Sequence, residues 1–323
     1  SAFSNADYAV TDWLTLGAGL RYDAYDLSAT ALMWEDATSS WYTENIASSG
    51  GRLLPSASVT VSPTEWLDIF GSYSEGYRPP SIMENAMSGT HIGSSGQFYA
   101  PNPYLKPEYS RTWEVGANLR FDDLVTGGDT FRLKLVGFDR LVENYISLAV
   151  LSLTRYQYTN VNSANDSRMK GVELEANYES DRFFVGGSYS YLDADIDTSY
   201  TLVYEVIPGM ELEYDIEGGL FIYIPPKHKA TLQAGVRLFD QRMTLGGRMT
   251  YAGPSIYRGS AGYQSDVEGF TVYDVFGSYD FNDTTTLNFA VNNITDVAYA
   301  DALGNPNWGA PGRTATVSLK VKF

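Results

Sequence analysis

Two histidines are the side chains best suited to hold a metal, because the chain has no cysteine. His91 lies in a segment rich in glycine and serine, Ser88-Gly89-Thr90-His91-Ile92-Gly93-Ser94-Ser95-Gly96. A neutral imidazole is a common protein ligand of iron and other metals. His91 is therefore a candidate iron ligand, and the alternative is an ordinary solvated histidine in a loop. His228 follows Pro225-Pro226-Lys227 where a strand is expected to begin, a position that tolerates proline, so we expect it to be a structural rim residue.

Aromatic and basic side chains flank His91 in the sequence. Tyr77, Phe98 and Tyr99 could stack on a flat ligand or contact a protein, although aromatic residues in such loops also serve in packing or at membrane interfaces. Arg78 could pair with a ligand carboxylate, because a guanidinium matches a carboxylate in geometry and charge. The alternative for Arg78 is that it braces the loop against carboxylates of the chain itself.

Carboxylates gather in the segment 194–224, which has no lysine or arginine. Its spacing matches no calcium-binding loop, so we expect a solvated acidic loop, and the alternation over 211–217 predicts a hairpin. No serine is placed beside either histidine on one strand face, as a hydrolase would require. We therefore predict no catalytic residue and no enzyme. The net charge of -17 also disfavours a nucleic-acid partner.

The elements that must position these residues have the period of β-strands. No stretch of comparable length favours a helix, because glycine and β-branched or aromatic residues interrupt every candidate. The clearest alternating stretches are 114–121, 171–178, 231–238 and 317–323. The segment Asn102-Pro103-Tyr104-Leu105-Lys106-Pro107-Glu108 predicts a rigid corner before a strand, since each proline fixes its own φ.

Short and long connections alternate along the chain. The short ones fall near 11–13, 63–65, 122–129, 180–182, 239–242 and 282–285. The long ones cover roughly 29–51, 79–107, 145–167, 194–224, 254–267 and 297–312. This asymmetry, together with many tyrosines near strand ends, is typical of an outer-membrane barrel with short turns on the periplasmic side. A soluble all-β protein with one polar face is the alternative.

The pattern predicts about 13 strands, with side chains that point alternately to hydrocarbon and to a watery interior. An open sheet leaves unpaired backbone groups at its edges, which a bilayer does not tolerate. Since the chain also opens in mid-pattern at Ser1, we expect it to be a fragment whose remaining wall lies upstream.

Several segments resemble one family of membrane receptors. The closing strand Val317–Phe323 resembles the terminal assembly signal of outer-membrane barrels, and Val291–Asp296 resembles the penultimate strand of TonB-dependent receptors. Gly76–Ser81 resembles their FRAP box, and Asn102–Glu108 resembles their NPNL box. With His91 between the two boxes, the arrangement is similar to that of haem and haemoglobin receptors, especially the hemophore-receptor branch.

The resemblance implies an all-β, antiparallel transmembrane β-barrel of about 22 strands in the bacterial outer membrane. Residues 1–323 would be its C-terminal portion, a single-domain fragment without the plug domain. The implied function is uptake of haem, which is a transported ligand and not an intrinsic cofactor, with His91 as axial ligand of the iron. Implied partners are haem or a haem protein (a hemophore or haemoglobin), outer-membrane lipid, and the TonB-ExbB-ExbD system acting through the plug. The alternatives are a ferric-siderophore or cobalamin receptor and, less favoured, a passive porin.

Overall fold

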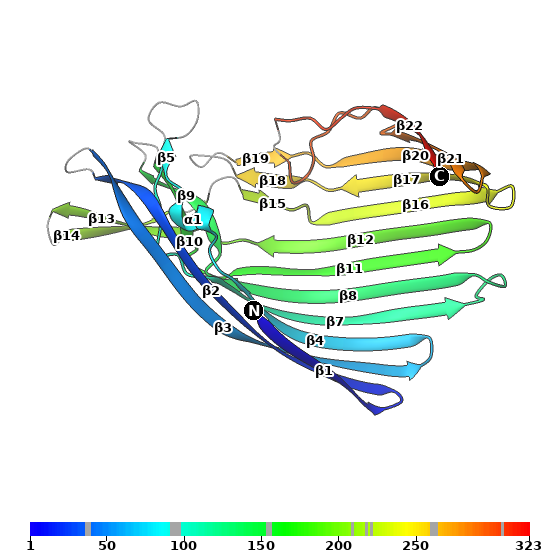
Figure 1. Cartoon of the computed structure of the whole chain (residues 1–323), viewed down its shortest axis with the longest axis horizontal. Coiled ribbons are helices and arrows are strands. Elements are labelled where there is room, and N and C mark those ends of the chain that lie inside the picture. Colours follow the sequence, from blue (N-terminus) through cyan, green and yellow to red (C-terminus); the bar gives the residue numbers. More distant parts are fainter. Residues whose placement is uncertain are drawn as a thin grey trace.

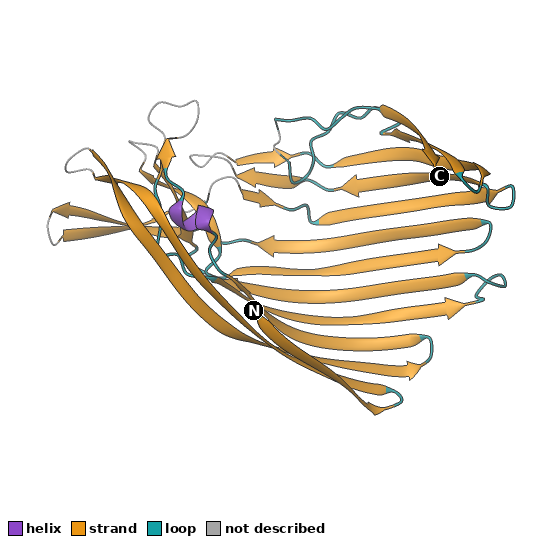
Figure 2. Cartoon of the chain, viewed as in Figure 1, coloured by secondary structure: helices purple, strands orange, loops and turns teal. Residues whose placement is uncertain are grey.

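The regular structure is almost entirely β-strand, with one short helix, α1 (Ile82–Ala86) (Figure 2). The computed structural model describes residues 1–35, 40–90, 98–152, 157–207, 210–216, 219, 222–258, 264–304 and 307–323. Among these residues, no helix has the length and apolar character needed to cross a membrane. The all-β fold class predicted from the sequence is confirmed.

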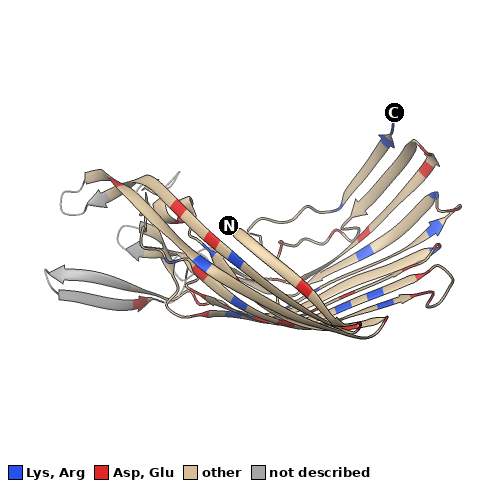
Figure 3. Cartoon of the chain, turned by 60° about the horizontal axis from the view of Figure 1, so that its bottom comes forward, with Lys and Arg blue, Asp and Glu red and all other residues tan. Residues whose placement is uncertain are grey.

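Thirteen long strands form one antiparallel sheet in which each strand pairs with the next long strand of the chain (Figure 1). The sheet is curved into a trough (Figure 3). Within the described residues, the first and the last strand each pair with a single neighbour. The strands are β1 (Ala2–Thr11), β2 (Leu14–Glu35), β3 (Ser40–Thr64), β4 (Leu67–Arg78), β7 (Glu108–Asp122), β8 (Thr130–Glu143), β11 (Ser167–Glu179), β12 (Phe183–Asp195), β16 (His228–Leu238), β17 (Met243–Ala252), β20 (Phe270–Asn282), β21 (Thr285–Asn292) and β22 (Thr314–Val321).

One face of the sheet is a belt of apolar side chains, which we call the apolar face. Cross-strand neighbours lie on the same face, as in the row Val115–Gly137–Val172. Val115, Val236 and Leu319 are 63%, 42% and 61% exposed, so they do not meet in a dry core. The opposite face, the polar face, carries cross-strand ion pairs of residues that are spaced along the strands (Figure 3). The predicted alternation of the two faces is therefore confirmed.

Aromatic residues mark two levels on the apolar face. Near the short turns, the ring of Phe121 stacks on Trp66 at 5.3 Å and lies 6.3 Å from Phe131. Towards the other end of the strands, Trp113 packs against Tyr73 at 4.6 Å. The stretch from Trp113 to Phe121 spans nine residues, and a tilted strand needs about 9–11 residues to cross a bilayer. The two levels are spaced as membrane interfaces are.

Phenylalanine rings lie over glycines of the neighbouring strand at four places on the polar face. A Cβ added to any of these glycines would lie 2.4–2.9 Å from a ring carbon, which is too close for contact. Each ring covers backbone that a glycine leaves bare, so the pairs help to fix the strand register. The pairs are Phe70 with Gly116, Phe138 with Gly171, Phe184 with Gly235, and Phe276 with Gly246.

The connections at the two ends of the sheet differ in length, as predicted. All the short turns named from the sequence lie at one end (Figure 1). In the turn between β7 and β8, the buried carboxylate of Asp129 accepts hydrogen bonds from the N–H groups of Leu124, Val125 and Thr126 and from the hydroxyl of Tyr178. The Asp129 side chain thus satisfies three successive backbone N–H groups of the turn.

The long connections contain more regular structure than the sequence predicted. Most of the connection expected over 29–51 is strand, because β2 continues to Glu35 and β3 begins at Ser40. Strands β13 and β14 pair as the hairpin that the alternation over 211–217 predicted. The other elements at this end are β5 (Gly89–Thr90), β6 (Phe98–Tyr99), β9 (Ile146–Ser152), β10 (Gln157–Asn162), β13 (Tyr200–Ile207), β14 (Met210–Ile216), β15 (Ile222–Ile224), β18 (Ser255–Arg258) and β19 (Gln264–Val267).

Candidate functional site

The connection between β4 and β7 forms a braced layer at the long-loop end of the sheet. It opens with α1, whose N-terminus is closed by a capping box: the Ser81 hydroxyl accepts from the Glu84 N–H, and the Glu84 carboxylate accepts from the Ser81 N–H at 2.7 Å. A serine three residues before a glutamate is a recognisable helix-start signal. The signal is readable in the sequence, but a helix of 5 residues is too short to show helical periodicity.

Arg78 ties this helix to the barrel wall. Its Nε and Nη2 donate to the two oxygens of Glu108 at 2.7 and 2.5 Å, and its Nη1 donates to Glu84 at 2.9 Å. Burial opposes ionisation of Glu84, but the Ser81 N–H and the Arg78 guanidinium outweigh it and lower the pKa of this carboxyl. Two carboxylates thus share one guanidinium. Arg78 braces the loop, as its alternative interpretation proposed, and its pairing with a ligand carboxylate stays a prediction.

Asparagine side chains attach the same connection to β10. Asn102 donates to the Asn160 carbonyl at 2.8 Å, and Asn160 donates to the Glu84 carbonyl at 3.1 Å. Asn162 both accepts from the Lys106 N–H and donates to its carbonyl, at 2.8 and 2.9 Å. These bonds satisfy backbone groups that the irregular chain would otherwise leave unpaired. The predicted corner is confirmed, since β7 begins at Glu108, directly after the second proline.

The predicted ligand residues do not all meet at this layer. His91 lies outside the described residues, between β5 and β6; these two strands pair with each other, and β6 also pairs with β10. Phe98 belongs to β6, but its side chain also lies outside the described part of the chain. The ring of Tyr99 is 5.8 Å from that of Tyr158. Tyr77 and Arg78 are successive strand residues and point to opposite faces, so the structure separates them.

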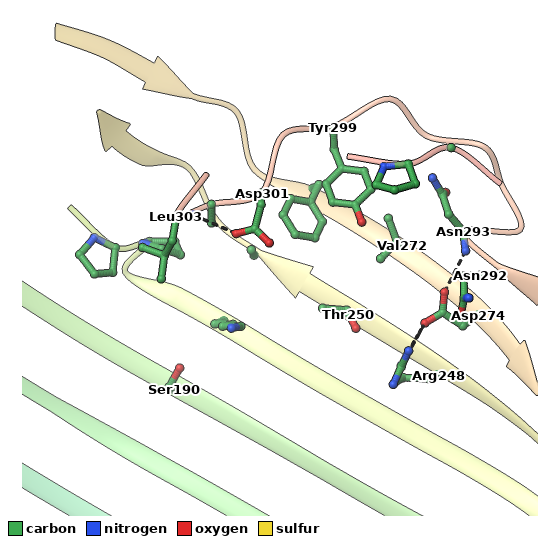
Figure 4. A pocket seen from close by; sticks show the side chains of 18 of the residues that line it. Ser190, Arg248, Thr250, Val272, Asp274, Asn292, Asn293, Tyr299, Asp301 and Leu303 are labelled. Atoms are coloured by element: carbon green, nitrogen blue, oxygen red, sulfur yellow. Dashed lines mark hydrogen bonds and ion pairs between the residues drawn. The ribbon is translucent and has the colours of Figure 1, made fainter. Parts of the chain in front are cut away.

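A second feature at this end is a chamber on the polar face, beneath the connection from β21 to β22 (Figure 4). Its volume is about 770 Å³, within the range of small-molecule sites. Asp274 links the sheet to the connection that follows β21. Its carboxylate pairs with Arg248 of β17 at 2.7 Å and accepts a hydrogen bond from the Asn293 N–H at 2.8 Å. The ring of Tyr299 packs against Phe270 at 4.3 Å.

The connection from β21 to β22 forms the roof of this chamber, and one asparagine holds it in place. The Asn293 side chain donates to the Val297 carbonyl at 2.9 Å and accepts from the Val297 N–H at 3.0 Å. Its φ of 49° is in the left-handed region, which asparagine tolerates better than most residues. None of the residues from Arg248 to Asn293 was a candidate in the sequence analysis, because only the pairing of β17, β20 and β21 brings them together.

In the described part of both features, ion pairs and hydrogen bonds hold the loops in place. Within the described ranges, no group of three or more His, Cys, Asp or Glu side chains is placed to hold a metal ion. Lys229 lines the chamber from β16, and no described carboxylate forms an ion pair with it. The site can therefore offer one cation and aromatic surfaces to a ligand on the polar face.

The family profile described as "TonB dependent receptor-like, beta-barrel" matches residues 1–294. The chain belongs to this family. The receptor barrel therefore lies in the outer membrane, and its apolar face is suited to contact lipid.

Two curated relatives of the receptor barrel come from Haemophilus influenzae and Acinetobacter baumannii. "Heme/hemopexin utilization protein C" of Haemophilus influenzae is 32% identical over 191 residues, which cover 54% of this chain and 24% of the relative. "Hemophilin receptor" of Acinetobacter baumannii is 24% identical over 310 residues, which cover 87% of this chain and 28% of the relative. The matched part is thus about a quarter of either relative.

Among solved structures, the receptor barrel is similar to the Serratia marcescens hemophore receptor HasR, solved as a double mutant in complex with its hemophore HasA and heme. The TM-score is 0.74 at 25% identity, and the match covers 99% of this chain and 50% of HasR. The copper transporter OprC matches with a TM-score of 0.71 at 17% identity, which shows the shared fold alone. Receptors of one architecture therefore carry different cargo.

Proposed function

We propose that this chain supplies wall and extracellular loops to a receptor that imports haem in a TonB-coupled step. The observation that carries the proposal is the braced connection 79–107, whose sequence contains His91 and whose flanks are held by ion pairs and amide hydrogen bonds. The relatives named for hemopexin, hemin and hemophilin support haem as the cargo. The likeness to HasR supports delivery by a haem-carrying protein.

In this proposal the chain performs no covalent chemistry. The loop offers the His91 imidazole to the iron of incoming haem, and a neutral imidazole suits that role. Arg78 is already paired with two carboxylates and acts on the position of the loop. Lys229 offers its charge to a propionate on the inner side, where the chamber is wide enough for a ring system. The energy comes from the TonB-ExbB-ExbD system, which acts through the plug.

Import of a ferric siderophore is the second candidate. The relative described as "Probable TonB-dependent siderophore receptor PiuA" of Acinetobacter baumannii is 25% identical over 322 residues, and the match covers 96% of this chain. That coverage is broader than the 54% matched by the hemopexin-related protein. The two candidates predict different ligands. The first predicts that the receptor binds haem, and the second predicts that it binds a ferric catecholate.

The test is a haem titration of the full receptor in detergent, followed by its Soret band. We expect His91→Ala to change the Soret spectrum and to weaken haem binding by about tenfold or more. His228→Ala is the matched control, because His228 faces lipid between Tyr189 and Tyr191 on the apolar face. It should leave both the spectrum and the affinity unchanged.

Three results would count against the proposal in different ways. If the wild-type receptor binds a ferric catecholate and gives no Soret change with haem, the cargo is a siderophore. If His91→Ala and wild type bind haem alike, His91 is not the ligand. If both histidine variants weaken binding equally, the effect is on folding and the site assignment is wrong.

A further inference from the structure

His91 follows directly after the two-residue strand β5, so the contacts that hold β5 set where the His91 segment begins. β5 is one edge of a four-stranded sheet with the order β5-β6-β10-β9. The pairing is short between β5 and β6 and between β6 and β10, and it extends over the whole of β10 only between β10 and β9. The pair of strands β9 and β10 is therefore the part of the sheet on which β6 and β5 depend.

Tyr200 of β13 packs on this pair of strands. It is 3% exposed and forms a buried cluster with Ala149 of β9, and Val161 of β10 and Ile216 of β14 pack against this cluster. The Tyr200 hydroxyl also donates to the Val150 carbonyl at 2.8 Å. Because an isolated pair of strands is only marginally stable, packing of this kind decides whether so small a sheet keeps its position.

Through Tyr200, a third long connection supports the four-stranded sheet. Tyr200 belongs to the segment 194–224, which we expected to be a solvated acidic loop. The start of this segment is fixed by two hydrogen bonds. The Asp197 carboxylate accepts from the Asn165 N–H at 2.8 Å, and the Asp197 N–H donates to the hydroxyl of Ser167, the first residue of β11, at 2.9 Å. Tyr200 is thus placed from a fixed point on the barrel wall.

The asparagine bonds described above also hold β10, through Asn102 and Asn160. These bonds join β10 to the connection between β4 and β7, whereas Tyr200 covers β9 and β10 from a different connection. Since the asparagine bonds remain when Tyr200 is replaced, its loss should loosen the four-stranded sheet without unfolding it.

We propose that Tyr200 is a positioning residue for haem binding, because it holds the four-stranded sheet and, through β6, the strand that precedes His91. A displaced β5 would move the His91 imidazole relative to the iron, and the affinity of a metal site depends on how its ligand is oriented. Tyr200 itself does not touch the haem. This inference rests on the proposed function, since it takes haem as the cargo and His91 as its ligand.

The first arm of the test measures hydrogen exchange in the full receptor without haem. Tyr200→Ala removes the ring and the hydroxyl, and it should speed exchange of the β5 and β6 amides by about tenfold. Tyr200→Phe keeps the ring and loses one hydrogen bond, so the increase should be about threefold. Tyr25→Phe is the matched control, because the Tyr25 hydroxyl bonds to Ser48 within the hairpin of β2 and β3, and exchange in β5 should not change.

The second arm is a haem titration followed by the Soret band. Tyr200→Ala should weaken haem binding by about fivefold and shift the Soret spectrum in the same direction as His91→Ala. In the His91→Ala background, Tyr200→Ala should have no further effect, because two residues that act through one interaction are not additive. Tyr25→Phe should bind haem as wild type does.

The outcomes separate this inference from the proposed function. If wild type gives no Soret change with haem, the proposed function is wrong and the inference falls with it. If His91→Ala weakens haem binding but Tyr200→Ala does not, the proposed function stands and the inference is overturned. An additive loss in the double variant overturns it as well, since Tyr200 would then act on binding independently of His91. Unchanged exchange of the β5 amides in Tyr200→Ala would show that Tyr200 does not hold this strand.

Discussion

Arg78 and Glu108 face each other across β4 and β7 and form two parallel hydrogen bonds, Nε to Oε2 at 2.7 Å and Nη2 to Oε1 at 2.5 Å. Both are strand-end residues, so the pair closes the sheet where the long connection leaves it. The third nitrogen of the same guanidinium reaches Glu84 in α1. The planar fork of arginine makes this three-body arrangement possible, and lysine cannot reproduce it.

Replacing Arg78 should loosen the loop without unfolding the sheet. Because the guanidinium is about half exposed, we expect Arg78→Gln to cost about 1 kcal/mol, close to the level of exposed ion pairs. That corresponds to about a fivefold faster hydrogen exchange of the α1 amides. Arg78→Lys should show most of the same effect.

A matched variant is Arg21→Gln, which removes an exposed pair with Asp23 on β2. It should leave exchange in α1 unchanged. If Arg78→Gln also leaves α1 unchanged, the three-body ion pair does not hold the loop.

Replacing a glycine that lies under a phenylalanine ring should cost more stability than replacing a glycine with open space around it. A Cβ at Gly171 would lie 2.2 Å from the Tyr191 carbonyl oxygen and 2.9 Å from the Phe138 ring, whereas a Cβ at Gly137 has 3.9 Å of clearance. We expect Gly171→Ala to lower the free energy of unfolding in lipid by about 2 kcal/mol. Gly137→Ala should stay within about 0.5 kcal/mol of wild type. Equal losses in urea titrations of the two variants would show that crowding by the Tyr191 carbonyl and the Phe138 ring is not responsible.

The turn held by Asp129 should respond to acid. Burial opposes ionisation of this carboxyl, but the Tyr178 hydroxyl and three backbone N–H groups outweigh it and hold its pKa far below the ordinary 3.8. A lowered folded-state pKa stabilises the folded form fully above the ordinary value, and this contribution is lost as pH falls below it. The stability gap between wild type and Asp129→Asn should therefore be constant near neutrality and shrink below about pH 4. The measurement is the melting temperature of both proteins across that pH range. If the hydrogen bonds of Asp129 do not stabilise the turn, the difference between the two melting temperatures will not change with pH.

The period-two pattern predicted the sheet well, because the alternation within each strand shows which of its residues point to the apolar face. Val115, Val172 and Val236 alternate with polar neighbours in their own segments, so no partner needs to be known. The positions of short turns followed from the same pattern. The count of about 13 strands agrees with the 13-stranded sheet for this reason.

The parts that the sequence did not predict depend on contacts between distant segments. Asp274 meets Asn293 only because of how β20 and β21 pair, and a single sequence does not reveal that register. The capping box at Ser81 and Glu84 was visible, but a five-residue helix is too short to show helical periodicity. The extension of β2 to Glu35 is supported by pairing with β3 throughout, which overrides local composition.

Asn293 should control the roof of the chamber. Its side chain makes both bonds to Val297, and its backbone has a positive φ that alanine adopts poorly. We expect Asn293→Ala to speed hydrogen exchange of the Val297 amide by about tenfold, as the loss of two hydrogen bonds and the added strain predict. Asn293→Gly keeps the conformation but loses the bonds, so it should give a smaller increase. Thr295→Ala, at an exposed position of the same turn, should give none. An increase with Thr295→Ala as large as that with Asn293→Ala would mean that the turn, and not this asparagine, holds the roof.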